Sequence, residues 1–276
     1  MASTRKRVAS LLDGGSSEHT NEVNKPTGIQ NREDHIVSEE RNRKHMPQQQ
    51  SNGLKIKLDH LKTFEPLTEN QRKLFASYAA GDYFIGVFGS AGTGKTFCSM
   101  YKAIEEAMDK SNSFKRIVVI RSCVQTRDVG FLPGNVDEKQ EIYELPYREI
   151  AATLFDRSDA WDRLKEQGYA RFISTTAIRG ISIDDSIVIV DEAQNMTWQE
   201  LNTIMTRIGY KSKILFVGDW KQNDLVKSRN DASGLLEFLN VVRKMKEFSE
   251  FTFTVEDIVR SSLVRSYIIA CEETGL

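Results

Sequence analysis

Short runs of β-branched and aromatic residues recur along most of the chain, and each is followed by a turn or by a stretch of helical period. The runs cover residues 83–88, 116–122, 171–175, 186–192, 213–219 and 250–254. Runs such as Ile117–Ile120 and Ile187–Val190 do not alternate with polar residues, which is typical of strands buried on both faces of a parallel sheet. Residues 96–110 have the period of a helix. This alternation predicts an α/β fold, with a mostly parallel, doubly wound sheet flanked by helices.

The amino-terminal part of the chain lacks this pattern. Residues 1–56 contain no aromatic side chain, and the first aromatic residue is Phe64. Such a polar segment buries too little apolar surface to offset the cost of ordering. We therefore expect a disordered polar tail over residues 1–56 and one ordered domain over residues 57–276.

The first helix of this domain has a recognisable start. Thr68 is followed three residues later by Gln71, at the beginning of the helical stretch 67–80. This spacing is the signature of a capping box, in which the two side chains satisfy free backbone N–H groups.

Composition narrows the classes of function. The formal net charge is −1, so any nucleic-acid binding must come from a local patch. The three cysteines are scattered, which favours reduced thiols in a cytoplasmic compartment. All four histidines lie within the first 60 residues, which argues against a zinc site or a Ser-His-Asp triad in the main domain. No apolar run approaches membrane-spanning length, and we expect no membrane partner.

One motif points directly to phosphate chemistry. It fits G-x-x-x-x-G-K-[ST] at every position and lies between a predicted strand and a predicted helix. Its residues are Gly89, Ser90, Ala91, Gly92, Thr93, Gly94, Lys95 and Thr96. Glycines let successive backbone N–H groups face one anion, at the positive end of the following helix. Lys95 would then reach the β- and γ-phosphates of a nucleotide, and Thr96 would hold Mg²⁺.

Two further motifs follow buried strands. Asp191 ends the run Ile187–Val190 and would lie beside the magnesium ion, while Glu192 offers a carboxylate that can deprotonate water. The residues Gly218 to Gln222 follow the next apolar run, and Gln222 could contact a γ-phosphate or its attacking water. Because ligands of such sheets gather at the carboxyl ends of strands, these side chains are expected to meet the phosphate loop.

The same motifs, in the same order, resemble the PhoH family of P-loop ATPases, which are related to the core of superfamily 1 helicases. The resemblance runs from about Phe64 to the end of the chain. It is carried by GSAGTGKT, RSCVQTRDVGFLPGNVDEK, IVIVDEAQNMT, MTRIGYKSKILFVGDWKQNDL and EDIVRSSLV. The chain departs from the common family pattern at Ser122, where proline is usual, and at Ala193-Gln194, which is closer to the helicase form.

The resemblance implies a RecA-like P-loop NTPase fold, ATP and Mg²⁺ as ligands, and ATP hydrolysis. In helicase relatives a glutamine upstream of the phosphate loop reads adenine, and Gln71 is the candidate here; the alternative is that it only closes the capping box. Helicases place ATP between two domains, whereas this chain has room for one. A neighbouring copy would then complete the site in a ring, which the resemblance suggests is a hexamer, with Arg260, or else Arg207, as the catalytic arginine.

The resemblance also raises nucleic-acid binding. Arg121, Arg127 and Lys139 follow the second strand, where helicase relatives contact single-stranded backbone, and Phe131 and Trp220 could stack on bases. RNA or single-stranded DNA is therefore a candidate partner, and a surface without nucleic acid remains the alternative. Because the family occurs in bacteria and phages, the expected location is bacterial cytoplasm, that of the host if a phage encodes the chain.

Two other functions remain open at this stage. One is a nucleotide or small-molecule kinase, although a water-activating carboxylate at Glu192 is unsuited to transfer to another acceptor. The other is an ATP-switched binding scaffold with little turnover, which the intact Glu192 disfavours.

Overall fold

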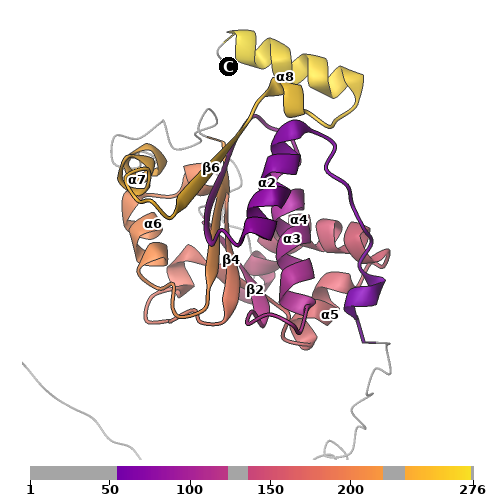
Figure 1. Ribbon diagram of the computed structural model, residues 1–276, viewed down its shortest axis with the longest axis vertical. Coiled ribbons are helices and arrows are strands. Elements are labelled where there is room, and N and C mark those ends of the chain that lie inside the picture. Colours follow the sequence, from indigo (N-terminus) through magenta and orange to yellow (C-terminus); the bar gives the residue numbers. More distant parts are fainter. Residues whose placement is uncertain (1–54, 124–135, 220–233, 275–276) are drawn as a thin grey trace, which may run out of the picture. The chain divides into compact units, whose positions relative to one another are not determined.

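The computed structural model describes residues 55–123, 136–219 and 234–274 (Figure 1), and all of them belong to one unit, Leu54–Leu276. Within these ranges, six strands form a single sheet in the order β3-β2-β4-β5-β1-β6, and every neighbouring pair is parallel. The strands are β1 Phe84–Gly89, β2 Arg116–Arg121, β3 Ala170–Ser174, β4 Ser186–Asp191, β5 Lys213–Gly218 and β6 Phe248–Phe253. The fold predicted from the sequence is confirmed, because each of the six apolar runs contains all or most of one of these strands.

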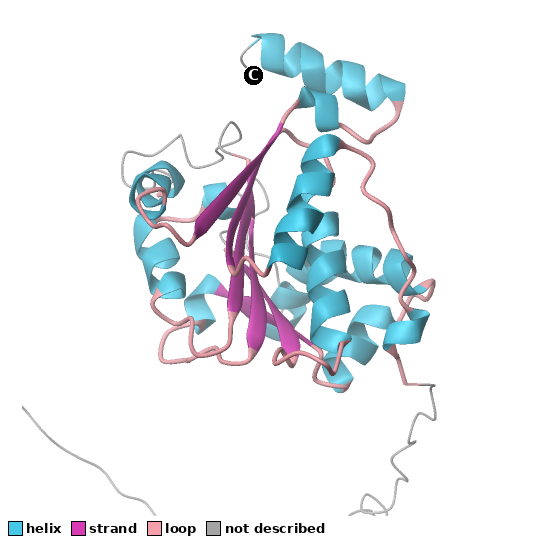
Figure 2. Cartoon of the chain, in the orientation of Figure 1, coloured by secondary structure: helices cyan, strands magenta, loops and turns pink. Residues whose placement is uncertain are grey.

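Helices cover both faces of the sheet (Figure 2). They are α2 Glu69–Ala80, α3 Lys95–Met108, α4 Val136–Phe155, α5 Ala160–Glu166, α6 Trp198–Met205, α7 Leu235–Val242 and α8 Ser262–Thr274, with short 3-10 turns between some of them. One hydrophobic core joins alternate strand residues to α2, α3, α4 and α5, and a second joins the intervening strand residues to α6 and α7. Burial on both faces explains why the central strands are apolar at nearly every position.

Strand β6 begins two residues before the predicted run because Phe248 pairs with Phe84 of β1. The two rings lie 4.8 Å apart, centroid to centroid, and Phe84 also contacts Phe216 of β5. Aromatic packing thus extends the sheet edge beyond what the period-2 pattern indicated.

Helix α2 begins as predicted, with Thr68 at its N-cap accepting a hydrogen bond from the backbone N–H of Gln71 at 3.3 Å. The capping box itself is different from the prediction. The side-chain oxygen of Gln71 accepts from the backbone N–H of Leu67 at 2.8 Å, where a capping box would use that of Thr68.

All six strands end at the same edge of the sheet, which in Figure 1 lies below helix α8. In the described parts of the chain, no helix is both long and apolar enough to span a membrane.

Candidate active site

The phosphate loop lies where the sequence predicted it, between the end of β1 and the start of α3. Its glycines Gly89, Gly92 and Gly94 have φ values of 124°, 72° and 81°, in the region that glycine adopts readily. At Gly89 a Cβ atom would lie 1.8 Å from the carbonyl oxygen of Phe253, and Ser90 donates its N–H to that same oxygen at 3.1 Å. The loop is therefore fixed to the end of β6, and only glycine fits its first position.

Lys95 is held across this loop by backbone oxygens. Its ammonium donates hydrogen bonds to the carbonyls of Gly89 at 2.7 Å and Ser90 at 2.6 Å. Burial lowers the pKa of Lys95, whereas the nearby carboxylates of Asp219, Glu192 and Asp191 raise it. A positive charge fixed in a poorly solvated loop interacts more strongly with a phosphate than one in water.

Thr96 and Asp191 meet as the motifs predict. The Thr96 hydroxyl donates to Asp191 Oδ1 at 2.9 Å, and the Tyr147 hydroxyl donates to Asp191 Oδ2 at the same distance. Burial raises the pKa of Asp191, as does Glu192, while the hydrogen bonds from Tyr147 and Thr96 and the charge of Arg121 lower it. Because the Thr96 proton is used on Asp191, its oxygen lone pairs are available to a cation.

This set of atoms suits magnesium. Mg²⁺ prefers oxygen ligands and is usually bound by one or two protein oxygens together with phosphates and water. The oxygens of Thr96 and Asp191 provide such a partial set. No group of three His, Cys, Asp or Glu residues that could hold a metal alone occurs among the residues described, so phosphate oxygens would supply the remaining ligands.

Glu192 stands next to this pair in an unusual backbone conformation. Its φ of 53° is uncommon for a residue other than glycine and occurs often at functional positions. Gln194 Nε2 donates to Glu192 Oε2 at 2.6 Å, and Gln194 Oε1 accepts from the backbone N–H of Asp219 at 3.0 Å. The buried Gln194 thereby connects the ends of β4 and β5 and fixes the Glu192 carboxylate.

Gln71 also reaches the phosphate loop. Its side chain is 3% exposed, and Nε2 donates to the carbonyl of Thr93 at 2.9 Å. Together with the bond from Leu67, this contact joins the start of α2 to the loop. Contact with adenine stays a prediction for Gln71.

The two candidate arginines lie at different places. The backbone N–H of Val259 donates to the carbonyl of Gly92 at 3.1 Å, and Arg260 Cγ lies 3.0 Å from where a Cβ on Gly92 would be. Arg260 is thus beside the phosphate loop of its own chain, whereas the sequence suggested a neighbouring copy. Arg207 lies near the start of β4, where its carbonyl accepts from the N–H of Ile183 at 2.9 Å.

Helix α8 also lies over the loop, and nothing in its sequence indicated this. Glu272 accepts a hydrogen bond from the Ser90 hydroxyl, and Ile268 Cδ1 lies 3.3 Å from where a Cβ on Gly92 would be. On its outer side, Leu263 and Tyr267 are exposed. The carboxyl-terminal helix therefore forms one wall of the candidate site.

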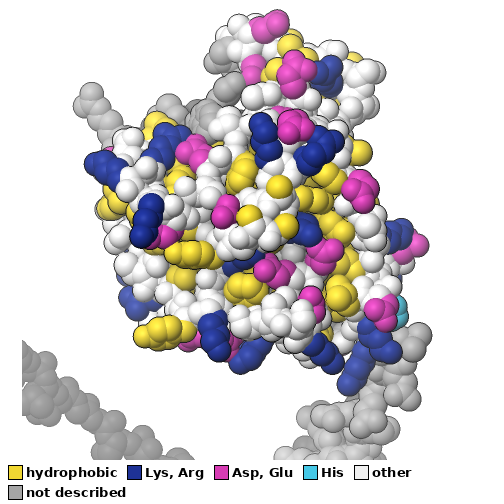
Figure 3. All heavy atoms as spheres, in the orientation of Figure 1, with side chains coloured by type: hydrophobic (Ala, Val, Ile, Leu, Met, Phe, Trp, Pro, Cys, Tyr) yellow, Lys and Arg dark blue, Asp and Glu magenta, His cyan; other side chains and the backbone are white. Residues whose placement is uncertain are grey.

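The candidate nucleic-acid residues are less fully described. Arg121 is partly buried beside the Asp191–Glu192 pair and lies 6.0 Å from the centre of the Tyr143 ring. Lys139 belongs to α4. Arg127, Phe131, Trp220 and Gln222 lie outside the described residues. On the face drawn in Figure 3, basic and acidic side chains are interspersed.

Tyr147 and Gln194 are the two residues of the site that sequence reasoning did not single out for a role. Gln194 had a signal, since it follows Asp191-Glu192-Ala193 at the end of a buried strand. Tyr147 had none, because it lies 44 residues from Asp191 within a helix.

An all-parallel sheet with a phosphate loop after β1 and an acidic pair after β4 defines the class of P-loop NTPases. The family model of PhoH, described as PhoH-like protein, matches residues 63–272. The chain belongs to the PhoH family.

Several proteins of known sequence resemble it. The PhoH-like protein of Bacillus subtilis is 32% identical over 213 residues, which cover 77% of this chain and 65% of that protein. The PhoH-like protein of Mycobacterium leprae is 31% identical over 80% of this chain and 62% of that protein. Protein PhoH of Escherichia coli is 34% identical over 63% of this chain and 49% of its own length. The chain thus spans about two thirds or less of these relatives.

Solved structures with similar folds include the large terminase of a thermophilic bacteriophage, with a TM-score of 0.43, 14% identity, and coverage of 74% of this chain and 50% of that one. The Hef helicase domain of Pyrococcus furiosus has a TM-score of 0.37 and 14% identity, over 66% of this chain and 38% of that one.

Proposed function

We propose that this protein hydrolyses ATP with Mg²⁺. The observation that supports this most is the position of Glu192, a fixed carboxylate next to the Thr96–Asp191 pair. The phosphate loop and Lys95 would bind the β- and γ-phosphates, and Thr96 and Asp191 would hold the metal. Bound Mg²⁺ would neutralise charge that develops on the phosphate oxygens.

In this mechanism Glu192 accepts a proton from water as the water oxygen bonds to the γ-phosphorus. The bond between that phosphorus and the bridging oxygen breaks, which yields ADP and inorganic phosphate. Gln194 keeps the carboxylate turned toward the site. We assign Gln222 to orienting the water or γ-phosphate, and Arg260 to stabilising charge on the transferred phosphoryl group.

The alternatives are a nucleotide or small-molecule kinase and an ATP-switched scaffold. Radiolabelled ATP, separated by thin-layer chromatography after incubation with the protein and Mg²⁺, distinguishes them. Hydrolysis gives labelled inorganic phosphate without an added acceptor. A labelled acceptor would support the kinase, and intact ATP that co-purifies with the protein would support the scaffold.

Nucleic acid and other copies of the chain are further parts of the proposal. We propose that hydrolysis is coupled to binding, remodelling or unwinding of RNA or single-stranded DNA, in the cytoplasm of a bacterial or phage-infected cell. We also propose that residues 57–276 carry the activity as a homo-oligomer, such as a hexameric ring. ATPase rates with RNA, single-stranded DNA and duplex, alongside a native mass, test both points; equal rates on all three and a monomer mass would contradict them.

A further inference from the structure

The hydroxyl of Tyr147 makes a contact that the general mechanism of such proteins does not require. Tyr147 lies on α4 with its side chain fully buried, and its hydroxyl donates to Asp191 Oδ2 at 2.9 Å. Thr96 donates to the other oxygen, Oδ1. The two oxygens of one carboxylate are thus held by donors from two different helices.

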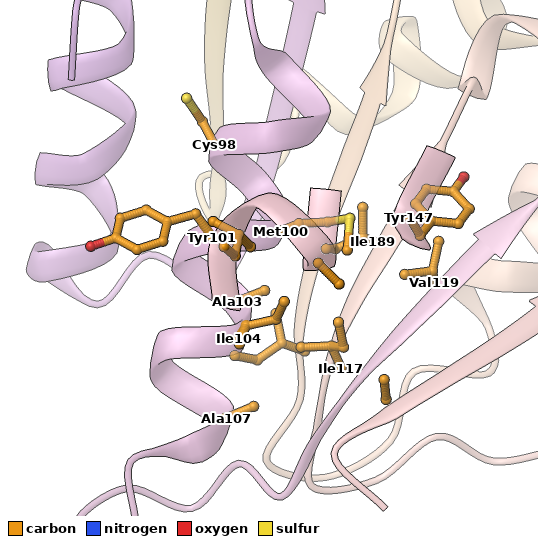
Figure 4. Packing of buried hydrophobic residues seen from close by; sticks show 14 of the residues in the cluster. Cys98, Met100, Tyr101, Ala103, Ile104, Ala107, Ile117, Val119, Tyr147 and Ile189 are labelled. Carbon is orange, nitrogen blue, oxygen red and sulfur yellow. The ribbon is translucent and has the colours of Figure 1, made fainter. Parts of the chain in front are cut away.

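The Tyr147 ring cannot move without disturbing the core. It lies 6.0 Å from the Trp161 ring and 5.9 Å from the Phe172 ring, centroid to centroid. Figure 4 shows it beside Val119, with its hydroxyl pointing away from the hydrophobic cluster. Because the ring is fixed by packing, the position of its hydroxyl is fixed as well.

Arg121 supports this arrangement from the end of β2. Its guanidinium is hydrogen-bonded to the Tyr147 hydroxyl and lies close to Glu192 and Asp191. Burial raises the pKa of Tyr147 well above its usual value, so the hydroxyl keeps its proton and acts as a donor to Asp191.

A carboxylate with one donor can rotate about its Cβ–Cγ bond. With donors on both oxygens, rotation of Asp191 would leave two buried hydroxyl groups without partners, which is costly. The lone pairs that Asp191 does not use are therefore held in one direction.

We propose that Tyr147, supported by Arg121, is a positioning residue that orients the Asp191 carboxylate for Mg²⁺. This inference rests on the proposed function, since it assumes that Asp191 serves a metal–nucleotide complex. Groups that hydrogen-bond to metal-binding side chains typically change metal affinity by about 10- to 100-fold when they are removed. Tyr147 would also connect α4 to the metal site, although it touches neither nucleotide nor metal.

The test compares Tyr147→Phe with Tyr143→Phe. The first keeps the packed ring and loses only the hydroxyl, and the second makes the same change one turn away on α4. Mn²⁺ binding to the protein–ADP complex is followed by the loss of the free Mn²⁺ signal in electron paramagnetic resonance. We expect Tyr147→Phe to raise the Kd for Mn²⁺ by about tenfold, while the affinity for ADP without metal is unchanged. Tyr143→Phe should match wild type.

Each outcome decides a separate point. Wild-type Mn²⁺ affinity in folded Tyr147→Phe overturns the inference alone, whereas a wild-type protein that binds no ADP overturns the proposed function. A parallel loss of metal-free ADP affinity and thermal stability would assign Tyr147 a merely structural role and also overturn the inference. If Tyr147→Phe does not fold, Arg121→Gln decides: we expect about threefold weaker Mn²⁺ binding, and wild-type affinity contradicts the inference.

Discussion

The ammonium of Lys95 is buried, yet oxygen atoms surround it. Two carbonyls of the phosphate loop accept its hydrogen bonds, and three carboxylates lie close enough to raise its pKa. The loop thereby holds a cation in place before any nucleotide arrives. Such preorganisation lowers the free-energy cost of binding a phosphate.

Lys95→Ala is expected to weaken ATP binding by about 100-fold, because a charge-assisted contact to the phosphates is lost. Fluorescent-nucleotide titration measures the affinity, and circular dichroism checks that the fold is retained. Lys102→Ala on the same helix, α3, serves as the control and should bind as wild type. Retained affinity in folded Lys95→Ala would refute the assigned role.

At the scale of elements, the end of β6 determines the shape of the phosphate loop. The carbonyl of Phe253 occupies the space where a side chain at Gly89 would begin. By contrast, Gly81, which caps α2 with a φ of 87°, has no atom within 4 Å of an added Cβ. The two glycines separate the cost of a steric clash from that of the backbone conformation alone.

Gly89→Ala is therefore predicted to lower the free energy of unfolding by about 3 kcal/mol or more, since the clash with backbone adds to the strained φ. Gly81→Ala should cost about 1 kcal/mol, from the left-handed conformation alone. Urea unfolding of both variants measures these values. Equal costs would show that β6 does not constrain the loop.

Helix α8 places a carboxylate beside the same loop. Because Glu272 accepts from Ser90, its charge lies near the site assigned to the phosphates. Glu272→Gln keeps an acceptor and removes the charge. We expect the Kd for ATP to fall about two- to fivefold, and the effect to shrink at high salt.

Isothermal titration at two salt concentrations checks this, with Glu273→Gln as the control on the adjacent, exposed residue. An unchanged or weaker affinity in Glu272→Gln would mean that α8 does not oppose nucleotide binding.

At the scale of the whole molecule, Arg260 raises the question of which copy it serves. Its side chain lies by the phosphate loop of its own chain, where it can act on the nucleotide bound there. Mixing Arg260→Ala with Glu192→Gln should then restore no turnover, because each chain needs both residues. Phosphate release that recovers at any mixing ratio would show that Arg260 acts across an interface between copies.

The sequence predicted those parts of the molecule that depend on neighbouring residues. Buried strands, the phosphate loop and the acidic pair after β4 all have local patterns. The contacts of Tyr147 with Asp191, and of Glu272 with Ser90, join positions 44 and 182 residues apart. Such contacts depend on how helices pack against the sheet, and the apolar period of a helix does not encode which polar tip meets which partner.

The same limit applies to Arg260 and Gln71. Motif order identified both as candidates, but their positions follow from the path of the chain after β6 and from the packing of α2. Only the structure could place Arg260 on its own loop and Gln71 on the carbonyl of Thr93.

Phosphate release by Glu192→Gln, measured with saturating Mg²⁺ and ATP, tests the central claim most directly. The variant keeps the size of the side chain and removes the proton acceptor. We predict a turnover about 10²- to 10⁴-fold below wild type with an unchanged affinity for ATP, while Glu237→Gln on α7 behaves as wild type. If Glu192→Gln releases phosphate as fast as wild type, the carboxylate after β4 does not activate water and the proposed mechanism is wrong.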